Sequence, residues 1–569
     1  MTSAGGARTV LDLARAEASL LVRSLLVLAG LLASGAVVWV LFGSVQPLWW
    51  NAAWQIGFGQ LILGLVVLAA AQLAAGRARR EGMADLYTSF PVTAGTRTVA
   101  HLASLAGAAP ASLLLTGAAA AVVQARGAIG TPAITVLASG LVLVIASGAA
   151  GIAIGTRFSH PLAGVLGALA LFITATTSHL VSGAAIWLVP WEWNQDQLSG
   201  LPGPLAGYPP AGAHLLELAG LAVLAGTVAL AVTAGHVRAR GALATAGIVA
   251  LAVTCLAGAL QLRPIPTAGL DHLVTETASL ASVQHCTTAN DIRYCLYPEF
   301  GRDLPSLEEP VNGVLARLPA RPSHPLRVQQ VLTLDLTDLT YGHSKDQISQ
   351  WRAQLRNARA SALTDTAIYL PVGSWPAGGS QLTDANFAVA LTTAEWGVRI
   401  PAQATGNPAS EQFLPCVPLN QAREAIAIWL AILATRPSAG ELQAGLSSGG
   451  HYLGDEVSNT FVPTWTYPGM TAGYLASSGF APQPTAAGYL LAAAMVSLPQ
   501  QKVSHVLASA WGRWLNWHTT DAQLAAALGI PMPSISTLVP PPPPGQTTGH
   551  GPGTGPQSPQ SPQSPLCTS

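Results

Sequence analysis

Seven long runs of apolar residues fall within the first 262 positions of the chain. A helix needs about 20 mainly apolar residues to cross the roughly 30 Å hydrocarbon layer of a bilayer, and each run is long enough. The expected spans occupy about residues 20–43, 54–75, 98–123, 132–156, 161–189, 212–235 and 243–262. The first run is too long for the apolar part of a signal peptide and is followed closely by the next, so we expect it to remain as an anchor.

The arginines of the short connections predict the orientation of these spans, because cytoplasmic loops are enriched in basic residues. The N-terminus and the loops after spans two, four and six carry Arg8, Arg15, Arg23, Arg77, Arg79, Arg80, Arg97, Arg157, Arg238 and Arg240. The alternate connections carry Arg126 together with the acids Glu192 and Asp196. We therefore expect the N-terminus in the cytoplasm and, with an odd number of spans, everything after Arg263 outside it. Loss of one span would reverse the second expectation.

The pattern changes after residue 263, where charged residues recur regularly, so residues 264–539 are expected to fold in water as a mainly helical domain with a small β element. Residues 331–339 alternate as in a half-buried strand. Helices are expected at about 344–363, 384–396, 420–436, 484–498, 500–517 and 520–528. Residues 540–569, rich in Pro, Gly, Ser and Gln, are predicted to form a disordered tail.

A short cysteine-bearing hairpin is expected near the start of this domain. If Asn290-Asp291 forms a two-residue turn, Cys286 lies directly opposite Cys295, at a separation that suits a disulfide. A disulfide requires an oxidising compartment, in agreement with the orientation expected from the arginines. The alternative is two free thiols in a reduced domain.

Composition supports a division between lipid and water. The chain is 50% hydrophobic and only 9% charged, with a mean hydropathy of +0.42, whereas soluble domains carry roughly 25% charged residues. The net charge is zero and no basic tract is present, so nucleic-acid binding has no support. The Ala, Gly, Pro and Arg bias is typical of a high-GC bacterial genome.

No catalytic or metal site is expected. Neither Lys345 nor Lys502 follows a glycine, so the chain has no Walker A motif, and any ATP-driven activity requires ATP and Mg²⁺ on a separate chain. The segment Gly445 to Gly449 fits the spacing of a nucleophile elbow, but a helical stretch precedes it where that motif requires a strand.

Polar residues within the expected spans are the candidates for a substrate path: Thr174, Thr177, Ser178, His179, His214 and Glu217. Polar groups at bilayer depth are costly and usually face a cavity or another helix. The alternatives are hydrogen bonding between helices for the threonines and serine, and an interfacial position for His214 and Glu217.

The segment from Glu81 to Arg97, between spans two and three, carries the most specific pattern. Its apolar residues recur at helical spacing and predict a short amphipathic helix near 81–91 that stops at a proline. The residues concerned are Glu81, Met83, Asp85, Leu86, Tyr87, Phe90, Pro91 and Arg97.

This segment resembles the coupling helix of ABC-2 type permeases, in which an acidic residue, an apolar helix, a proline and an arginine followed by Ala-His-Leu join the second and third spans. Residues 8–19 resemble the N-terminal interfacial helix of that family. Multi-span permeases of high-GC Gram-positive bacteria also carry a large C-terminal domain with a Cys, a strand and Cys-x-x-Pro, as from Cys286 to Pro298. The family usually has six spans, not seven.

The resemblance implies a permease domain at 1–263, an extracytoplasmic domain at 264–539 and a tail at 540–569. It further implies that the chain is a non-enzymatic subunit of an ATP-driven exporter in the bacterial cell membrane. Its expected partners are a cytoplasmic ABC ATPase, a second permease subunit and membrane lipid. The alternative is a membrane-anchored extracytoplasmic enzyme, receptor or scaffold, for which the spans are only an anchor.

Overall fold

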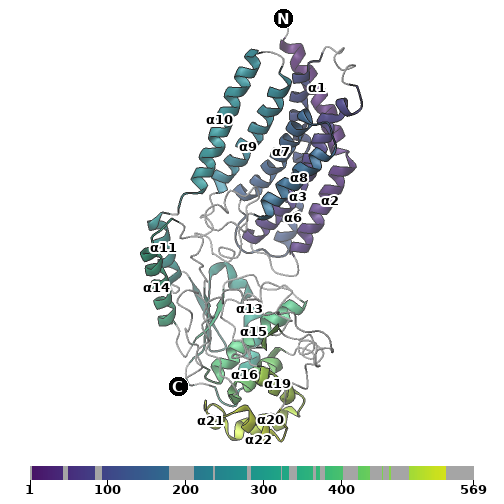
Figure 1. The fold of residues 1–569 in the computed structure, drawn as a ribbon. Helices are drawn as coiled ribbons and strands as arrows, with labels where there is room; N and C mark the ends of the chain where they lie inside the picture. The colour runs from purple at the N-terminus through teal and green to yellow at the C-terminus, as the bar shows by residue number, and fades with distance from the viewer. Residues whose placement is uncertain are drawn as a thin grey trace, which may run out of the picture. The chain divides into compact units, whose positions relative to one another are not determined.

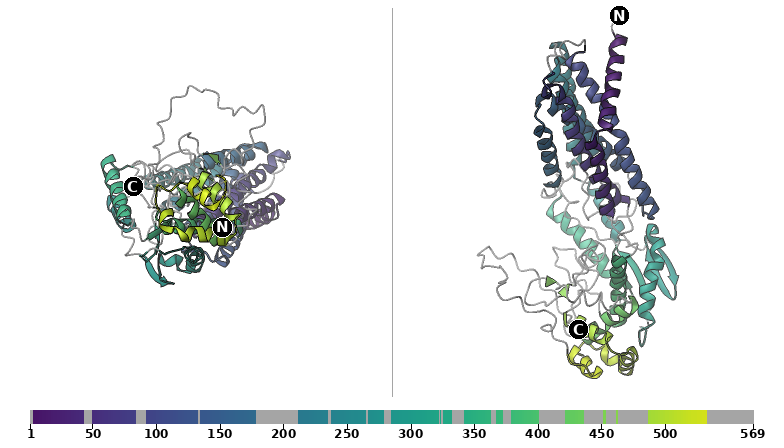
Figure 2. Two further views of the ribbon diagram at one scale, coloured as in Figure 1. Left: turned by 90° about the horizontal axis from the view of Figure 1, so that it is seen from below. Right: turned by 90° about the vertical axis from the view of Figure 1, so that its right-hand side faces the viewer.

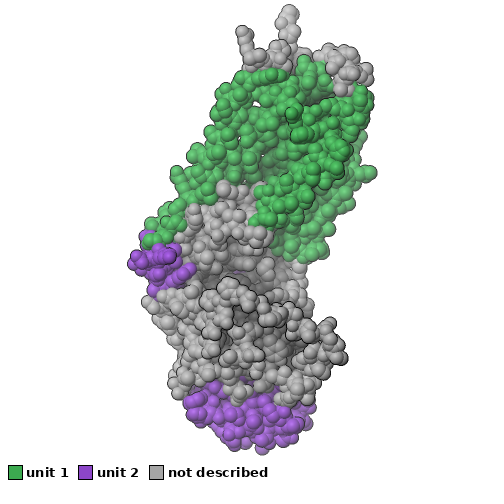
Figure 3. All heavy atoms as spheres, viewed as in Figure 1, with its two compact units in different colours: residues 1–270, 335–344 green, residues 271–334, 345–569 purple. Residues whose placement is uncertain are grey.

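The computed structural model divides the chain into two compact units, one formed by residues 1–270 and 335–344 and the other by residues 271–334 and 345–569 (Figure 3). We call them unit 1 and unit 2. The structure describes residues 3–42, 49–83, 92–132, 134–177, 211–234, 237–264, 266–278, 284–321, 323, 325–331, 342–362, 367–371, 379–400, 421–435, 451–452, 461–462 and 486–532.

Unit 1 consists of long helices that run side by side (Figures 1 and 2). They are α1 (Ser3–Val22), α2 (Leu25–Phe42), α3 (Trp49–Arg80), α5 (Ala94–Ser104), α6 (Ala109–Ala125), α7 (Ile134–Arg157), α8 (Leu162–Thr177), α9 (Ala211–Thr233) and α10 (Val237–Gln261). A single 3₁₀ turn, η1 (Leu105–Gly107), joins α5 to α6.

Five of the described helices are long and apolar enough to cross a membrane: Ala52–Arg80, Ala94–Ala125, Ile134–Arg157, Ala211–Thr233 and Ala239–Gln261. A sixth is possible if α1 and α2 count as one span bent by 54°. The expected span at 161–189 corresponds to α8, which is described only for Leu162–Thr177 and is shorter than a span. The structure therefore describes a multi-span helical bundle with five or six candidate spans.

Helix α7 packs against both α3 and α9. Its contact with α3 is close because glycines replace side chains between the two backbones. A Cβ atom added at Gly151 would collide with the carbonyl oxygen of Leu68, and one added at Gly155 would lie 2.6 Å from the carbonyl oxygen of Gln72. Small residues at such positions let membrane helices approach closely and gain van der Waals contact.

Unit 2 is built on a four-stranded sheet in the order β1-β2-β3-β4. The strands are β1 (His285–Ala289), β2 (Ile292–Leu296), β3 (Arg327–Val331) and β4 (Ala367–Pro371). Strands β1 and β2 form an antiparallel hairpin, whereas β2–β3 and β3–β4 are parallel. Parallel neighbours need a crossover, which α13 (Leu304–Leu315) and α14 (Lys345–Ala362) provide.

The core of unit 2 surrounds α16 (Ala422–Thr435), whose residues from Ala422 to Ile432 are all buried. The other helices are α15 (Gly379–Gly397), α19 (Ala486–Val496), α20 (Gln500–Ser509), α21 (Trp511–Trp514) and α22 (Asp521–Leu528). Helix α11 (Thr267–Ala278) contains the boundary between the units, after Leu270. A 3₁₀ helix, η5 (Pro298–Asp303), follows β2. The two-residue strands β5 (His451–Tyr452) and β6 (Phe461–Val462) pair with each other in antiparallel orientation. Helices α13, α15 and α19 pack on α16.

Most expected helices of this region are confirmed, and two elements differ. The helix expected at 500–517 is divided into α20 and α21, because Ala510 leaves the helical region with φ −140° and ψ 36°. Strand β3 ends at Val331, where the expected strand 331–339 begins, and residues 332–341 lie outside the described part. The predicted tail, residues 540–569, also lies outside it.

Candidate functional site

Three polar side chains join the ends of α9 and α10. The Nδ1 atom of His214 lies 3.1 Å from the Oε1 atom of Gln261, and the Nε2 group of Gln261 donates a hydrogen bond to the Oε2 atom of Glu217. His214 Nδ1 also lies 3.9 Å from Glu217 Oε2. We call His214, Glu217 and Gln261 the α9–α10 network.

The network is buried: His214 and Gln261 are each only 2% exposed. Gln261 is the last residue of α10, and His214 lies in the first turn of α9, so the contacts hold together the two helix ends opposite the short connection at 234–236. His214 and Glu217 were expected from the sequence, whereas Gln261 was missed. Its signal was present, since Gln261 is the one amide side chain of the expected span 243–262.

The threonines of the predicted path do not join this network. Thr174 and Thr177 are exposed, and each hydroxyl donates to a carbonyl oxygen of its own helix, Ala170 at 2.9 Å and Ile173 at 2.7 Å. Ser178 and His179 lie outside the described residues.

A second polar group, also missed by the sequence analysis, joins α3 to α6. Gln60 Nε2 donates to the Ser112 carbonyl at 2.9 Å and to Thr116 Oγ1 at 2.7 Å, and Ser112 Oγ donates to Gln60 Oε1 at 2.8 Å. Both Gln60 and Ser112 are fully buried. These bonds satisfy the amide, so this group acts as a contact between helices and leaves no polar atom available for a substrate.

The ends of the predicted coupling segment are well defined. Helix α3 stops at Arg80, Gly82 takes the left-handed conformation with φ 67°, and the Met83 amide donates to the Ala78 carbonyl at 3.0 Å. Such a glycine just after a helix is a common stop signal. At the other end, Thr93 caps α5 by accepting from the Thr96 amide at 3.1 Å.

The predicted coupling residues are thus described only in part. Glu81 is exposed at the end of α3, Met83 follows Gly82, and Arg97 lies in the first turn of α5. Asp85, Leu86, Tyr87, Phe90 and Pro91 lie outside the described residues.

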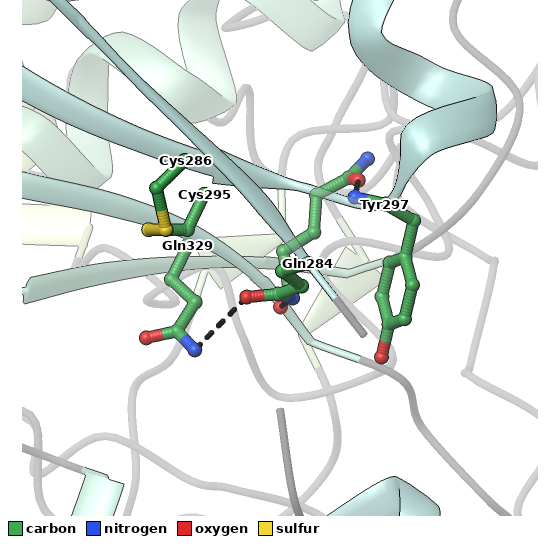
Figure 4. Close-up of a disulfide and its surroundings, with 6 residues drawn as sticks. Gln284, Cys286, Cys295, Tyr297 and Gln329 are labelled. Atoms are coloured by element: carbon green, nitrogen blue, oxygen red, sulfur yellow. Dashed lines mark hydrogen bonds between the residues drawn. A yellow bond between two sulfur atoms is a disulfide. The ribbon is translucent and has the colours of Figure 1, made fainter. Parts of the chain in front are cut away.

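The predicted disulfide is present in unit 2 (Figure 4). Asn290 and Asp291 take positive φ angles of 50° and 62°, which a two-residue hairpin turn requires. The resulting register places Cys286 opposite Cys295, with Cα atoms 4.0 Å apart, and the two sulfur atoms are bonded. The pairing inferred from the sequence is therefore confirmed.

Glutamine side chains form hydrogen bonds next to this hairpin (Figure 4). Gln329 of β3 is the register partner of Cys295, and its Nε2 group donates to Gln284 Oε1 at 3.1 Å. The neighbouring Gln330 accepts from the Tyr297 amide at 2.9 Å. These bonds tie the segment before β1 and the end of β2 to β3.

Unit 2 also buries three charged residues next to one another, and the sequence analysis missed them. Arg423 and Glu424 open α16, and Glu395 lies on α15; all three are less than a tenth exposed. Arg423 donates to the Gln421 side chain at 2.7 Å and to the Arg399 carbonyl at 2.9 Å. Burial raises the pKa of Glu395 well above its ordinary value, and the negative charge of Glu424 raises it further. The positive charge of Arg423 lowers it by a smaller amount. Burial therefore favours the protonated form of the Glu395 carboxyl group.

Within the described residues, no group of three or more His, Cys, Asp or Glu side chains is arranged to hold a metal ion. In comparison with known proteins, no protein-family model, no curated protein and no solved structure matches the chain. The class that the fold defines is thus a helical protein with several candidate membrane spans and a second unit built on a small sheet.

Proposed function

We propose that the chain is the permease subunit of an ATP-driven ABC exporter of the bacterial cell membrane. The observation that carries the proposal is the segment from Glu81 to Arg97, which joins two candidate spans and has the residue pattern of an ABC-2 coupling helix. Its helix-stop glycine and its capping threonine leave about ten residues between α3 and α5, enough for two turns of helix. A passive anchor has no need of such an element.

The proposed topology has seven spans, with the N-terminus in the cytoplasm and residues 264–569 outside. The arginine distribution supports it, and so does the disulfide of the β1–β2 hairpin, which an oxidising compartment favours. Two permease subunits would form the path and two cytoplasmic ATPases, holding ATP and Mg²⁺, would drive it. The α9–α10 network, at the ends of two candidate spans, supports a path that opens at these ends, because a largely buried carboxylate such as Glu217 is costly unless it has a partner or a role.

The rival proposal is a membrane-anchored enzyme or receptor. It is favoured by one observation, the buried group of Glu395, Arg423 and Glu424 in unit 2, since buried charges with altered pKa values gather at functional sites as well as in structural networks.

A substitution in the coupling segment separates the two proposals. Leu86→Asp would place an unpaired carboxylate in the apolar groove of the ATPase, at a cost of several kcal/mol. We expect loss of co-purification with the ATPase and of transport-stimulated ATP hydrolysis. Thr88→Asp is the matched control, because at helical spacing Thr88 lies away from the apolar face formed by Met83, Leu86, Tyr87 and Phe90. If Leu86→Asp keeps both the partner and the stimulated hydrolysis, the anchored protein is the better proposal.

A further inference from the structure

The four-stranded sheet of unit 2 ends in two edge strands, β1 and β4, that differ in exposure. Strand β4 is buried at Ala367 and Ile368. Three of the five residues of strand β1 are exposed, among them Thr287 and Thr288. Strand β1 is therefore the accessible edge of the sheet.

The register of the β1–β2 hairpin determines which backbone groups of β1 face outwards. The two residues that flank the turn form a hydrogen-bonded pair, and hydrogen-bonded and non-hydrogen-bonded pairs then alternate along the ladder. Cys286 and Thr288 belong to non-hydrogen-bonded pairs, so their N–H and C=O groups point away from β2. The same alternation holds on β2, where the Arg293 amide donates to the Leu326 carbonyl at 3.0 Å, on the side of β3.

Two N–H groups and two C=O groups therefore line the outer edge of β1, one of each from Cys286 and from Thr288. None of the four has a hydrogen-bond partner among the described residues. Proteins usually protect such an edge with a charged residue, a proline or a bulge, because a free edge pairs with other strands. Strand β1 contains no Lys, Arg, Asp, Glu or Pro, and its register with β2 has no bulge. It is therefore able to pair with a further strand.

The arrangement of these groups is complementary to itself. When two β1 strands are placed antiparallel about a twofold axis at Thr287, Cys286 of each copy lies opposite Thr288 of the other. Each of these two pairs exchanges two backbone hydrogen bonds, so the four bonds use every outward group of both strands. The axis falls on the middle residue of β1, so the strands overlap over their whole length, and no like charges meet. A second copy of this chain is thus the occupant that fits the edge.

The disulfide holds this edge in place. Strand β1 is hydrogen-bonded on one side only, and the bond from Cys286 to Cys295 attaches it covalently to β2 (Figure 4). Cys295 is in turn the register partner of Gln329 on β3. The outward groups of β1 are therefore fixed before a partner strand arrives, which lowers the entropy cost of pairing.

We propose that two copies of this chain pair through their β1 strands, so that their two sheets join into one continuous sheet. Thr287 then lies opposite Thr287 of the second copy at a non-hydrogen-bonded site, where threonine pairs are favourable. The proposal does not depend on the chain being a permease. Together with that function, it makes the second permease subunit another copy of the same chain.

Disulfide crosslinking of the full chain in native membranes tests this contact. The starting chain keeps the disulfide of the hairpin and has its other three cysteines replaced by serine. Thr287→Cys places two thiols directly opposite each other, at a Cα separation of about 4.5 Å that suits a disulfide. We expect mild oxidation to give a covalent dimer in which peptide mass mapping finds the two introduced cysteines linked. Ser323→Cys, at an exposed position outside β1, is the control for random collision and should give little dimer.

A second substitution tests whether the contact is a backbone pairing. Thr288→Pro removes an N–H group that takes no part in the β1–β2 ladder, so the hairpin should keep its disulfide. The pairing loses two of its four hydrogen bonds, and we expect the dimer yield of the Thr287→Cys chain to fall at least about tenfold. Thr288→Val is the matched control, because it keeps the N–H group and the branched side chain and should leave the yield unchanged.

If Thr288→Pro prevents the internal disulfide from forming, Thr288→Lys replaces it, because a lysine on a strand edge opposes pairing. A dimer as abundant with Ser323→Cys as with Thr287→Cys would overturn the proposal, and so would equal yields with Thr288→Val and with the proline or lysine variant. A Thr287→Cys chain that stays monomeric, or that crosslinks only to a different protein, would also overturn it. Co-purification with the ATPase is measured separately, so failure of this pairing and failure of the proposed function are distinguishable.

Discussion

At Asp521, two effects on one carboxyl group oppose each other. As the first residue of α22 it meets the positive end of a helix dipole, which favours the carboxylate. The side chain is 1% exposed, however, and neither oxygen has a hydrogen-bond partner among the described residues. Burial prevails and raises the pKa of Asp521 from 3.8 to about 6.

The Asp521 carboxyl group therefore contributes more to the stability of unit 2 in acid than at neutral pH. A folded-state pKa above the unfolded value gives stability that is complete below about pH 4 and is lost as the pH rises through about 6, a change of about 3 kcal/mol. Asp521→Asn should remove this contribution. We expect thermal unfolding of the full chain, with hydrogen exchange of α22 as the local readout, to depend less on pH between 4 and 7 in the variant. An unchanged pH dependence would contradict the assignment.

Single residues were predictable where local geometry fixes the partner. Cys286 and Cys295 are nine positions apart across one turn, so the register followed from Asn290-Asp291 alone. Gln261 was missed because its partners lie 44 and 47 positions earlier in the chain. Arg423 and Glu395 were missed for the same reason, since the effect of each charge on the other depends on how α15 and α16 pack.

At the scale of elements, the α3–α7 contact predicts a sharp response to one methyl group. Gly151→Ala would drive a Cβ atom into the Leu68 carbonyl, and overpacking of this kind costs about 1–3 kcal/mol. The expected result is a lower melting temperature of the full chain in detergent. Gly35→Ala in α2 is the control, because no atom lies within 4 Å of the added Cβ. Equal melting temperatures of the two variants would show that the close approach of α3 and α7 does not contribute to the stability of the fold.

Helices were predicted better than strands, for a physical reason. The apolar runs of α16 and α19 are local and persist over several turns, whereas β3 is five residues long and is defined by its parallel neighbours. The break between α20 and α21 was not predicted, because Ala510 is a strong helix former and only the backbone angles reveal the turn.

For the whole molecule, the proposed topology predicts which side each unit faces. In a chain whose Cys255, Cys416 and Cys567 are replaced by serine, a cysteine at the exposed Ser323 should react with a membrane-impermeant thiol reagent in intact cells. A cysteine at the exposed Thr9 should react only after the cells are permeabilised. The reverse pattern would contradict an extracytoplasmic unit 2.

The composition of the sequence predicted a protein with several candidate membrane spans. The number of spans depends on whether α1 and α2 count as one bent span, and hydropathy alone does not decide this.

The position of α7 between α3 and α9 has a consequence for the order of synthesis. Helices α3 and α7 are not consecutive, because α5 and α6 lie between them in the chain. When α3 has been synthesised, the glycine face of α7 that it packs against has not yet been translated. Until Arg157 has been translated, α3 can therefore pack only on helices that precede α7 in the chain, such as α2 and α6. A nascent chain arrested before Ile134 would lack the central helix, which makes α7 the point at which a set of inserted spans becomes a packed bundle.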